Sequence, residues 1–256
     1  MVRLFEQFGK RKVTLLDGIW KFKSDPQNLG KDEEWFSHFP LDAVDIAVPS
    51  CWNNELGLYS YEGMAWYARE ITIDSTCSKL VFHGITGQAT IYLDGKEIGS
   101  HYGGFTGFEC FLENLNPGIH SLVISVDSSL DDYNTITQNF MDWFHYGGIN
   151  RSVELMALPD LWIDKLTIDY TLSEDLKTAS VKAKILLKTA GSKLESSLLN
   201  LCVHYENTDN IPIYSDKIEV KGQTSIVIEH TLTDINLWDT DSPNLSTFTA
   251  STDQDD

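Results

Sequence analysis

The sequence predicts an all-β fold, and three observations lead to that prediction. Turn signals recur about every ten residues, the runs between them are short and rich in Val, Ile, Thr and aromatic residues, and convincing helical periodicity is hard to find. The segment "GKDEEWFSHF", with acidic residues near its start, is expected to form a helical turn or two at most.

Individual strands can be read from local patterns. In "ATIYLDGKEIGS", Asp94 and Gly95 separate two strand-like runs, and Asp-Gly favours the positive backbone angles of a tight hairpin turn. Further along, "NPGIHSLVISVDSS" places a turn before Leu122, Ile124 and Val126, which alternate with period two. We expect a hairpin at the first site and a half-buried strand at the second.

The character of the sequence changes around "ALPDLWIDKLTIDY". Glycines and aromatic residues are frequent before it, and plainer strands such as "ASVKAKILLKT", "LLNLCVHYENT" and "TSIVIEHTLT" follow. We place a domain boundary near Leu158 to Asp160, which gives domains of residues 1–159 and 160–256. The second has the size and strand spacing of an immunoglobulin-like β-sandwich, although the Cys and Trp hallmark of that fold is missing.

Composition argues against several classes of partner. The chain has 19 basic and 38 acidic residues, a net charge of -19, so it would repel nucleic-acid phosphates. No apolar run approaches the ~18 residues of a membrane span, and the first residues lack a secretory signal pattern. The four scattered cysteines predict free thiols. We expect a cytoplasmic protein with no nucleic-acid or membrane partner.

No metal or cofactor site is predicted. His83, His101 and His120 share no ligand-like spacing, and ordinary strand or turn roles account for isolated histidines. The glycine-rich "HYGGFTG", residues 101–107, lacks the G-x-G-x-x-G arrangement and following helix of a phosphate site, so it predicts a bend between strands.

Glu55 in "NNEL" is not predicted to be catalytic, because it lies in a polar, glycine-bounded loop with no second carboxylate obviously beside it. In "PSCW", just before this loop, Trp52 is expected to anchor a chain turn as a buried indole.

The stretch "NFMDWFHYGGINRSVEL", residues 139–155, places Asp142 among aromatic residues. In one interpretation, Asp142 caps a turn or pairs with Arg151 while the aromatic residues pack beneath. In the other, its carboxylate accepts hydrogen bonds from sugar hydroxyls between flat aromatic walls. Sequence spacing leaves both interpretations open.

Several ordered motifs resemble the amino-terminal part of glycoside hydrolase family 2, the β-glucuronidases and β-galactosidases, with a lean towards the β-glucuronidases. They are "LDGIWKF", "VPSCWN", "MAWYAREI", "IYLDGKEIGSHYGGFTGFE", "DWFHYGGINRSVEL", "WIDKLTI" and "LWDTDSPNLSTFTAS". The resemblance implies a jelly-roll, galactose-binding-domain-like β-sandwich followed by an immunoglobulin-like β-sandwich. The family's catalytic (β/α)8 barrel is not represented in these residues.

The resemblance also implies site residues. The aspartate of the family stretch "D-F-F-N-Y-G-G-I-x-R" contacts substrate hydroxyls at the mouth of the barrel, and Asp142 matches it. Trp143 replaces the usual Phe and His145 the usual Asn, which puts the sugar preference in doubt. Arg151 matches the motif's arginine and is expected to be structural. Trp52 and Asn53 are further predicted to face the same cleft.

The expected function is therefore that of the non-catalytic amino-terminal part of a retaining, β-glucuronidase-like β-glycosidase. No catalytic residue is assigned in this chain, because the family's two catalytic glutamates lie in the barrel. The expected partners are a carbohydrate, the protein's own barrel and further copies of the same chain. Two alternatives stay open: a free-standing carbohydrate-binding module, and purely structural or oligomerisation domains.

Overall fold

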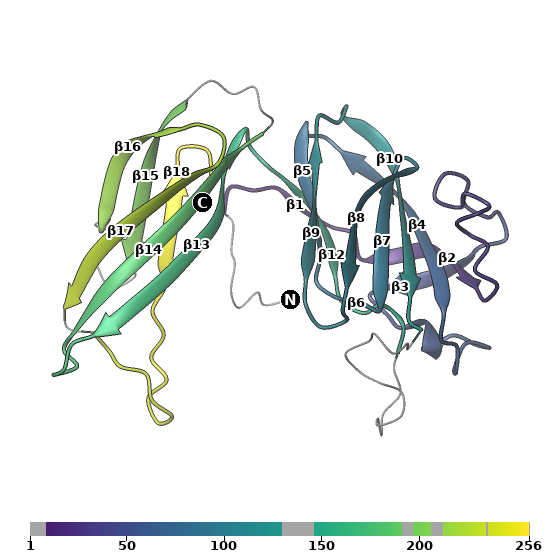
Figure 1. The fold of residues 1–256 in the computed structure, drawn as a ribbon, viewed down its shortest axis with the longest axis horizontal. Coiled ribbons are helices and arrows are strands. Elements are labelled where there is room, and N and C mark those ends of the chain that lie inside the picture. Colours follow the sequence, from purple (N-terminus) through teal and green to yellow (C-terminus); the bar gives the residue numbers. More distant parts are fainter. Residues whose placement is uncertain (1–8, 130–145, 191–196, 206–211, 234, 256) are drawn as a thin grey trace. The chain divides into compact units, whose positions relative to one another are not determined.

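A computed structural model describes residues 9–129, 146–190, 197–205, 212–233 and 235–255. The chain forms two compact units, which we call the amino-terminal sandwich, Lys12–Ala157, and the carboxy-terminal sandwich, Leu158–Asp256 together with the described residues 9–11. All strand pairs are antiparallel, and the predicted all-β fold is confirmed (Figure 1).

The amino-terminal sandwich contains a four-stranded sheet of order β1-β12-β5-β9, a six-stranded sheet of order β3-β2-β4-β10-β7-β8 and the small pair β11-β6. The strands are β1 (Val13–Leu15), β2 (Gly18–Asp25), β3 (Val44–Val48), β4 (Met64–Ile73), β5 (Cys77–Phe82), β6 (Ile85–Thr86), β7 (Gln88–Leu93), β8 (Lys96–Tyr102), β9 (Phe108–Glu113), β10 (Gly118–Asp127), β11 (Gly148–Ile149) and β12 (Val153–Ala157).

The core of this sandwich is aromatic and follows strand alternation. On β2, Trp20 and Phe22 are buried and Lys21 between them is exposed, as expected for a strand with one face in a core. Phe22 meets Tyr67 of β4 edge to face, with ring centroids 5.1 Å apart. These rings belong to one cluster with Phe82, which β5 contributes from the four-stranded sheet.

Two local predictions are confirmed in this sandwich. Asp94 and Gly95 adopt positive φ angles of 49° and 78° in the hairpin between β7 and β8, as the Asp-Gly pair predicts. The glycine-rich segment 101–107 begins at the end of β8, and residues 103–107 connect β8 to β9, which matches the predicted bend between strands.

The segment "GKDEEWFSHF" forms turns, not a regular helix, and its aromatic side chains pack in a cluster with the six-stranded sheet. Its first turn is organised by the buried Asp25, whose carboxylate accepts hydrogen bonds from the Leu29 and Gly30 backbone N–H groups at 2.8 Å each. The same carboxylate accepts the indole N–H of Trp66 at 3.1 Å, which ties this segment to β4.

The carboxy-terminal sandwich contains two three-stranded sheets, of order β13-β14-β17 and β16-β15-β18 (Figure 1). The strands are β13 (Leu161–Leu172), β14 (Thr178–Thr189), β15 (Ser197–Tyr205), β16 (Tyr214–Val220), β17 (Thr224–Thr233) and β18 (Phe248–Thr252). Burial alternates along β14, and Ile185 and Leu187 enter a core shared with Leu201 and Val203 of β15. The three strands predicted in this region are confirmed as β14, β15 and β17.

The described residues before β1 belong with the carboxy-terminal sandwich, although the predicted first domain began at residue 1. Arg11 is buried there, and its guanidinium donates to both carboxylate oxygens of Asp255 at 2.8 and 2.6 Å. The Ile163 backbone N–H also donates to Asp255 at 2.7 Å. This buried ion pair explains why both ends of the described chain lie in one unit.

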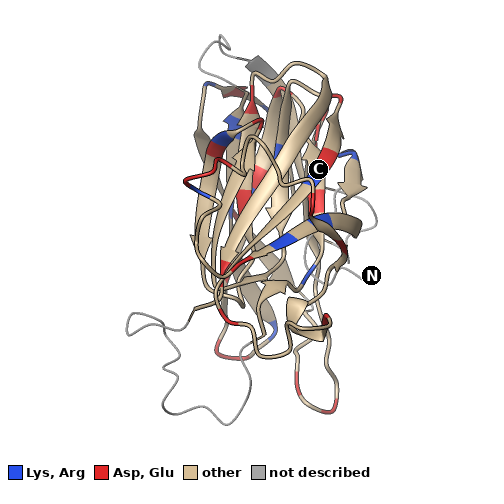
Figure 2. Cartoon of the chain, turned by 90° about the vertical axis from the view of Figure 1, so that its right-hand side faces the viewer, with Lys and Arg blue, Asp and Glu red and all other residues tan. Residues whose placement is uncertain are grey.

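Charged residues are distributed over the described chain. Figure 2 shows the blue Lys and Arg positions scattered among the red Asp and Glu positions, so the acidic excess is not confined to one segment. In the part of the chain that the structure describes, no helix has the length and apolar character needed to cross a membrane.

Candidate functional site

The candidate site is the loop region at one end of the amino-terminal sandwich where residues 146–153 return to the sheets. Asp142, Trp143 and His145 lie outside the described residues. The positions of the two predicted sugar contacts, Asp142 and Trp143, are therefore not described. The structure does describe the chain directly after them, and the contacts of Gly147 to Val153 define how this segment is held.

Gly147 lies directly against the Trp52 indole. Trp52 is fully buried, and its backbone N–H donates to the Gly147 carbonyl at 3.1 Å. A Cβ atom built on Gly147 would lie 2.1 Å from the Trp52 ring, well inside contact distance. Only glycine therefore fits at position 147 without displacing the indole. The predicted burial of Trp52 at a chain turn is confirmed, and the ring packs between segments far apart in sequence.

Asn53 connects this glycine to the preceding loop. Its side-chain Oδ1 accepts the Gly147 backbone N–H at 2.9 Å. Its Nδ2 lies within 3.0 to 3.2 Å of three backbone carbonyls, those of Leu58, Tyr59 and Tyr61. Asn53 is 3% exposed, so these bonds are shielded from water. The amide thus fixes the 58–61 loop and the start of the 147–153 segment relative to each other.

The next residues pair with the sandwich through short backbone contacts. Gly148 has φ +131°, and a Cβ there would lie 2.8 Å from the Ser50 carbonyl. The Ser50 N–H donates to the Ile149 carbonyl at 2.9 Å, and β11 pairs with β6. Beside Gly148, the phenol of Tyr67 is buried, and burial raises its pKa above the ordinary value. Tyr67 is therefore neutral in the folded protein.

Asp17 holds the end of the segment, a role that the sequence analysis missed. Its carboxylate accepts the Ser152 hydroxyl at 2.9 Å and the Val153 backbone N–H at 3.1 Å. The signal was present, because Asp17 lies in the "LDGIWKF" motif, but no local pattern shows that this motif meets residue 152. Arg151 is exposed, and its backbone N–H donates to the Gly84 carbonyl at 3.2 Å.

These contacts bear on the predicted roles of Trp52 and Asn53. Both side chains are buried, and the Trp52 indole N–H donates to the Tyr61 carbonyl at 3.1 Å. Their polar atoms are thus occupied within the sandwich, and a ligand contact through them stays a prediction. What the geometry does provide is a set of hydrogen bonds that hold residues 147–153, which follow Asp142 and Trp143 in the sequence.

Other polar groups in this region do not form a catalytic set in the described structure. Glu55 is exposed at the end of the short 3-10 helix η1, Trp52–Asn54, and its backbone N–H donates to the Trp52 carbonyl. Tyr61 donates its hydroxyl to the Met64 carbonyl at 2.5 Å, and burial raises its pKa to about 12. Tyr61 therefore keeps its proton at neutral pH.

The histidines singled out in the sequence have separate partners. His120 contacts Asp94 through Nδ1 at 2.6 Å, His101 stacks on Phe108 with centroids 4.3 Å apart, and His83 lies 3.4 Å from Glu154. Among the described residues, no three His, Cys, Asp or Glu side chains gather in a metal-binding arrangement.

A second polar feature lies on the outer face of the six-stranded sheet. It is a depression of about 210 Å³, which we call the sheet-face depression, and its lining combines hydrogen-bonding side chains with aromatic rings. The lining residues are Asn28, Lys31, Met64, Trp66, Gln88, Thr90, Tyr92, Ser125 and Asp127. The Trp66 and Tyr92 rings stack with centroids 5.9 Å apart. This lining offers donors, acceptors and an apolar ring surface together.

Comparison with known proteins assigns both sandwiches to one family. Residues 13–159 match the family model described as "Glycosyl hydrolases family 2, sugar binding domain", and residues 162–256 match "Glycosyl hydrolases family 2". The two matches cover nearly the whole chain, in the order that the resemblance implied.

Curated relatives carry β-glucuronidase names. A putative β-glucuronidase of Formosa agariphila is 28% identical over 212 residues, which cover 79% of this chain and 25% of that protein. The β-glucuronidase of Streptococcus agalactiae is 27% identical over 248 residues, with 80% and 40% covered. The human β-glucuronidase is 27% identical over 237 residues, with 76% and 36% covered. The chain therefore spans a quarter to two fifths of the length of these relatives.

Solved structures show the same architecture. A family 2 β-galacturonidase from Eisenbergiella tayi, bound to galacturonate, aligns over 100% of this chain and 43% of its own, with a TM-score of 0.77 and 26% identity. A β-glucuronidase from an uncultured Clostridium species aligns over 100% and 45%, with a TM-score of 0.76 and 27% identity. The fold and both family matches agree, and the chain belongs to glycoside hydrolase family 2.

Proposed function

We propose that the chain is the non-catalytic amino-terminal part of a retaining β-glycosidase that removes a terminal β-linked uronic acid. The β-glucuronidase names of the curated relatives and the galacturonate-bound structural relative support a uronic acid over a neutral sugar. Catalysis itself is assigned to a barrel outside these residues, where a pair of carboxylates would carry out a double displacement.

The observation that carries this proposal is the set of hydrogen bonds that hold residues 147–153. A substrate contact is effective only when its position is fixed before binding, because ordering a loop during binding consumes free energy. Asn53 and Trp52 fix Gly147, and Asp17 fixes Ser152 and Val153. We propose that this support aims Asp142 at substrate hydroxyls, with Trp143 as an apolar wall.

The test compares two proteins on 4-nitrophenyl β-D-glucuronide and the matching galacturonide. The 256-residue chain alone should give no turnover, and the protein from the complete reading frame should hydrolyse at least one substrate. In that protein, Asp142→Ala should lower kcat/KM by about 10 to 100-fold, the loss expected for a hydrogen bond to a charged group. Asp131→Ala, an acid earlier in the same sequence segment, is the matched control.

Turnover by the 256-residue chain itself would refute the assignment of catalysis to the barrel. Equal activity of the Asp142→Ala protein and its control would instead remove the substrate contact from the proposal. It would leave the alternative in which both sandwiches serve only to pack the barrel and other copies of the chain.

A second candidate function is carbohydrate binding without hydrolysis, which the sheet-face depression favours. Its Asp127, Gln88 and Lys31 side chains offer both acceptors and donors for sugar hydroxyls. Binding on a glycan array that is lost in Asp127→Ala and Gln88→Ala, but kept in Asp142→Ala, would support this function. A cytoplasmic setting is also proposed, because the four cysteines are scattered through the sequence without the spacing of a disulfide framework.

A further inference from the structure

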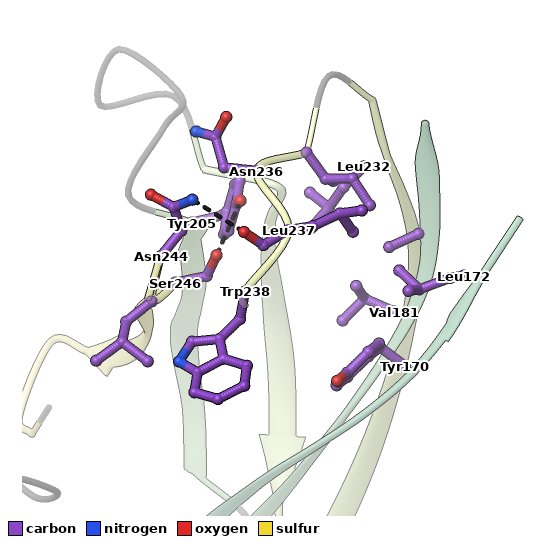
Figure 3. A pocket seen from close by; sticks show the side chains of 13 residues that line it. Tyr170, Leu172, Val181, Tyr205, Leu232, Asn236, Leu237, Trp238, Asn244 and Ser246 are labelled. Atoms are coloured by element: carbon purple, nitrogen blue, oxygen red, sulfur yellow. Dashed lines mark hydrogen bonds between the residues drawn. The ribbon is translucent and has the colours of Figure 1, made fainter. Parts of the chain in front are cut away.

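The carboxy-terminal sandwich contains the larger of the two cavities described here, and the proposed function does not use it. Its volume is about 490 Å³, within the range of about 300–1,000 Å³ that small-molecule sites occupy. The cavity lies between the β13-β14-β17 sheet and residues 235–246, and we call it the 235–246 pocket (Figure 3).

Two exposed aromatic side chains border this pocket. Trp238 is 59% exposed and Tyr170 is 69% exposed, and they come from the 235–246 segment and β13. Figure 3 shows the Trp238 indole and the Tyr170 ring on different sides of the opening. Large aromatic rings that stay accessible at a pocket mouth offer flat surfaces for stacking a planar ligand.

The floor of the pocket is apolar. Ala179 and Val181 of β14 and Leu232 of β17 line it and belong to one buried cluster with Tyr205. Leu172 and Leu245 extend the apolar surface outward, with exposures of 37% and 84%. A contiguous exposed apolar surface of this kind marks a binding site more often than an ordinary surface.

The lining contains no charged residue among the described residues, although the chain carries a net charge of -19. A charged ligand would lose its hydration here without gaining a counter-charge. A sugar would place several hydroxyl groups against Val181 and Leu232, whose side chains cannot form hydrogen bonds with them. These two arguments favour a neutral, mainly apolar ligand over an anion or a simple sugar.

A few polar groups lie at one side of the pocket and its wall is braced. Asn236 and Ser246 line that side, and the Tyr205 and Ser246 hydroxyl oxygens lie 3.2 Å apart. Asn244 Nδ2 donates to the Leu237 carbonyl at 2.9 Å, as the dashed line in Figure 3 shows. An isolated antiparallel β-bridge between Trp238 and Pro243 further stabilises this wall. A braced wall is largely formed before any ligand arrives.

We propose that the 235–246 pocket binds a neutral aromatic or fused-ring compound that carries a single hydroxyl group. The rings lie on the floor of Ala179 and Val181 and against the Trp238 indole. The hydroxyl group reaches the polar side, where the Asn236 side chain or the Ser246 hydroxyl bonds it. This binding does not depend on the proposed glycosidase function, because it uses only the carboxy-terminal sandwich.

The test measures binding of 2-naphthol to the 256-residue chain by isothermal titration calorimetry. Submillimolar binding is expected, while naphthalene-2-sulfonate, with the same rings and a negative charge, and methyl β-D-glucoside should bind at least about tenfold more weakly. Trp238→Ala removes a wall and should weaken 2-naphthol binding about tenfold. Leu245→Asp places a charge at the mouth and should weaken it similarly. Phe105→Ala, a 69% exposed ring of the other sandwich, is the matched control and should bind as the parent does.

Three results would overturn the proposal. The first is 2-naphthol binding that is unchanged in both Trp238→Ala and Leu245→Asp. The second is equal binding of naphthol and its sulfonate. The third is absence of naphthol binding. Sedimentation velocity then tests whether a second copy of the chain occupies the pocket instead. Self-association that Leu245→Asp abolishes would make the pocket a contact between copies of the chain, whereas a monomer would leave no small-molecule site there.

Discussion

Asn53 Oδ1 accepts the backbone N–H of Gly147 at 2.9 Å, across 94 positions of sequence. The same amide lies within hydrogen-bonding distance of three carbonyls of the 58–61 loop. One buried side chain therefore satisfies backbone groups from two loops that share no strand pairing with each other. These backbone groups are buried, so water cannot replace a lost hydrogen-bond partner. Removing the Asn53 side chain should therefore lower the stability of the fold.

Replacing Asn53 by alanine should destabilise the amino-terminal sandwich by about 3 kcal/mol, because it leaves several buried backbone groups unpaired. Urea unfolding followed by tryptophan fluorescence measures the change. Asn54→Ala, at the exposed neighbouring position, should stay within about 0.5 kcal/mol of the parent. Equal midpoints for the two variants would show that the Asn53 bonds contribute nothing.

Replacing Gly147 by alanine should cost about 1–3 kcal/mol, because the added Cβ would lie 2.1 Å from the Trp52 ring. Trp52→Phe removes part of that ring and should itself destabilise, since Trp52 is fully buried. The two changes should not be additive. In the double variant the smaller ring makes room for the methyl group, so its loss of unfolding free energy should be smaller than the sum. An additive result would contradict the direct contact.

Much of the fold follows from local chemistry that a sequence displays. The hairpin at Asp94 and Gly95 was predictable because the two residues alone favour that turn. Strand β14 was predictable because its apolar residues alternate with polar ones, except at Leu186. Trp52 was predictable as a buried residue because a side chain as large and apolar as an indole is usually buried.

The support of the candidate site was not predictable from local patterns. Asn53 and Gly147, and Asp17 and Ser152, meet only after the strands have brought distant segments together. A polar residue in a loop motif gives no sign of which backbone groups it will pair with. For the same reason the sequence did not reveal the pairing of Arg11 with Asp255, which lies 244 positions away.

The pair of His120 and Asp94 should titrate abnormally. The hydrogen bond from His120 to Asp94 raises the histidine pKa above its ordinary 6.5. Burial of Asp94 opposes its ionisation, but its hydrogen bonds to His120 and to the Ser121 N–H outweigh that effect and lower its pKa below 3.8. NMR titration of the His120 ring should thus show a midpoint above 6.5 that Asp94→Asn lowers. Asp45→Asn, on β3, should leave it in place.

The sign of the linked stability change follows from these directions. The contribution of His120 is fully present below pH 6.5 and is lost as pH rises through its higher folded-state pKa. The contribution of Asp94 is present above pH 3.8 and is lost as pH falls through its lower folded-state pKa. The difference in unfolding midpoint between the parent and Asp94→Asn should thus be largest between these values. A difference that grows steadily up to pH 9 would contradict the assignment.

The buried pair of Arg11 and Asp255 should respond very differently to single and double replacement. Their side chains are 1% and 0% exposed, so removing either partner leaves an uncompensated charge in the carboxy-terminal sandwich. Arg11→Met and Asp255→Leu should each cost about 3–5 kcal/mol. Combining them removes both charges, although the Ile163 N–H and carbonyl that the pair bonds are then left unsatisfied. The double variant should therefore recover part of the loss, and chemical unfolding of all four proteins gives the coupling energy. If each single change costs less than about 1 kcal/mol, the pair behaves as a solvated surface contact and the amino-terminal segment is not anchored through Arg11.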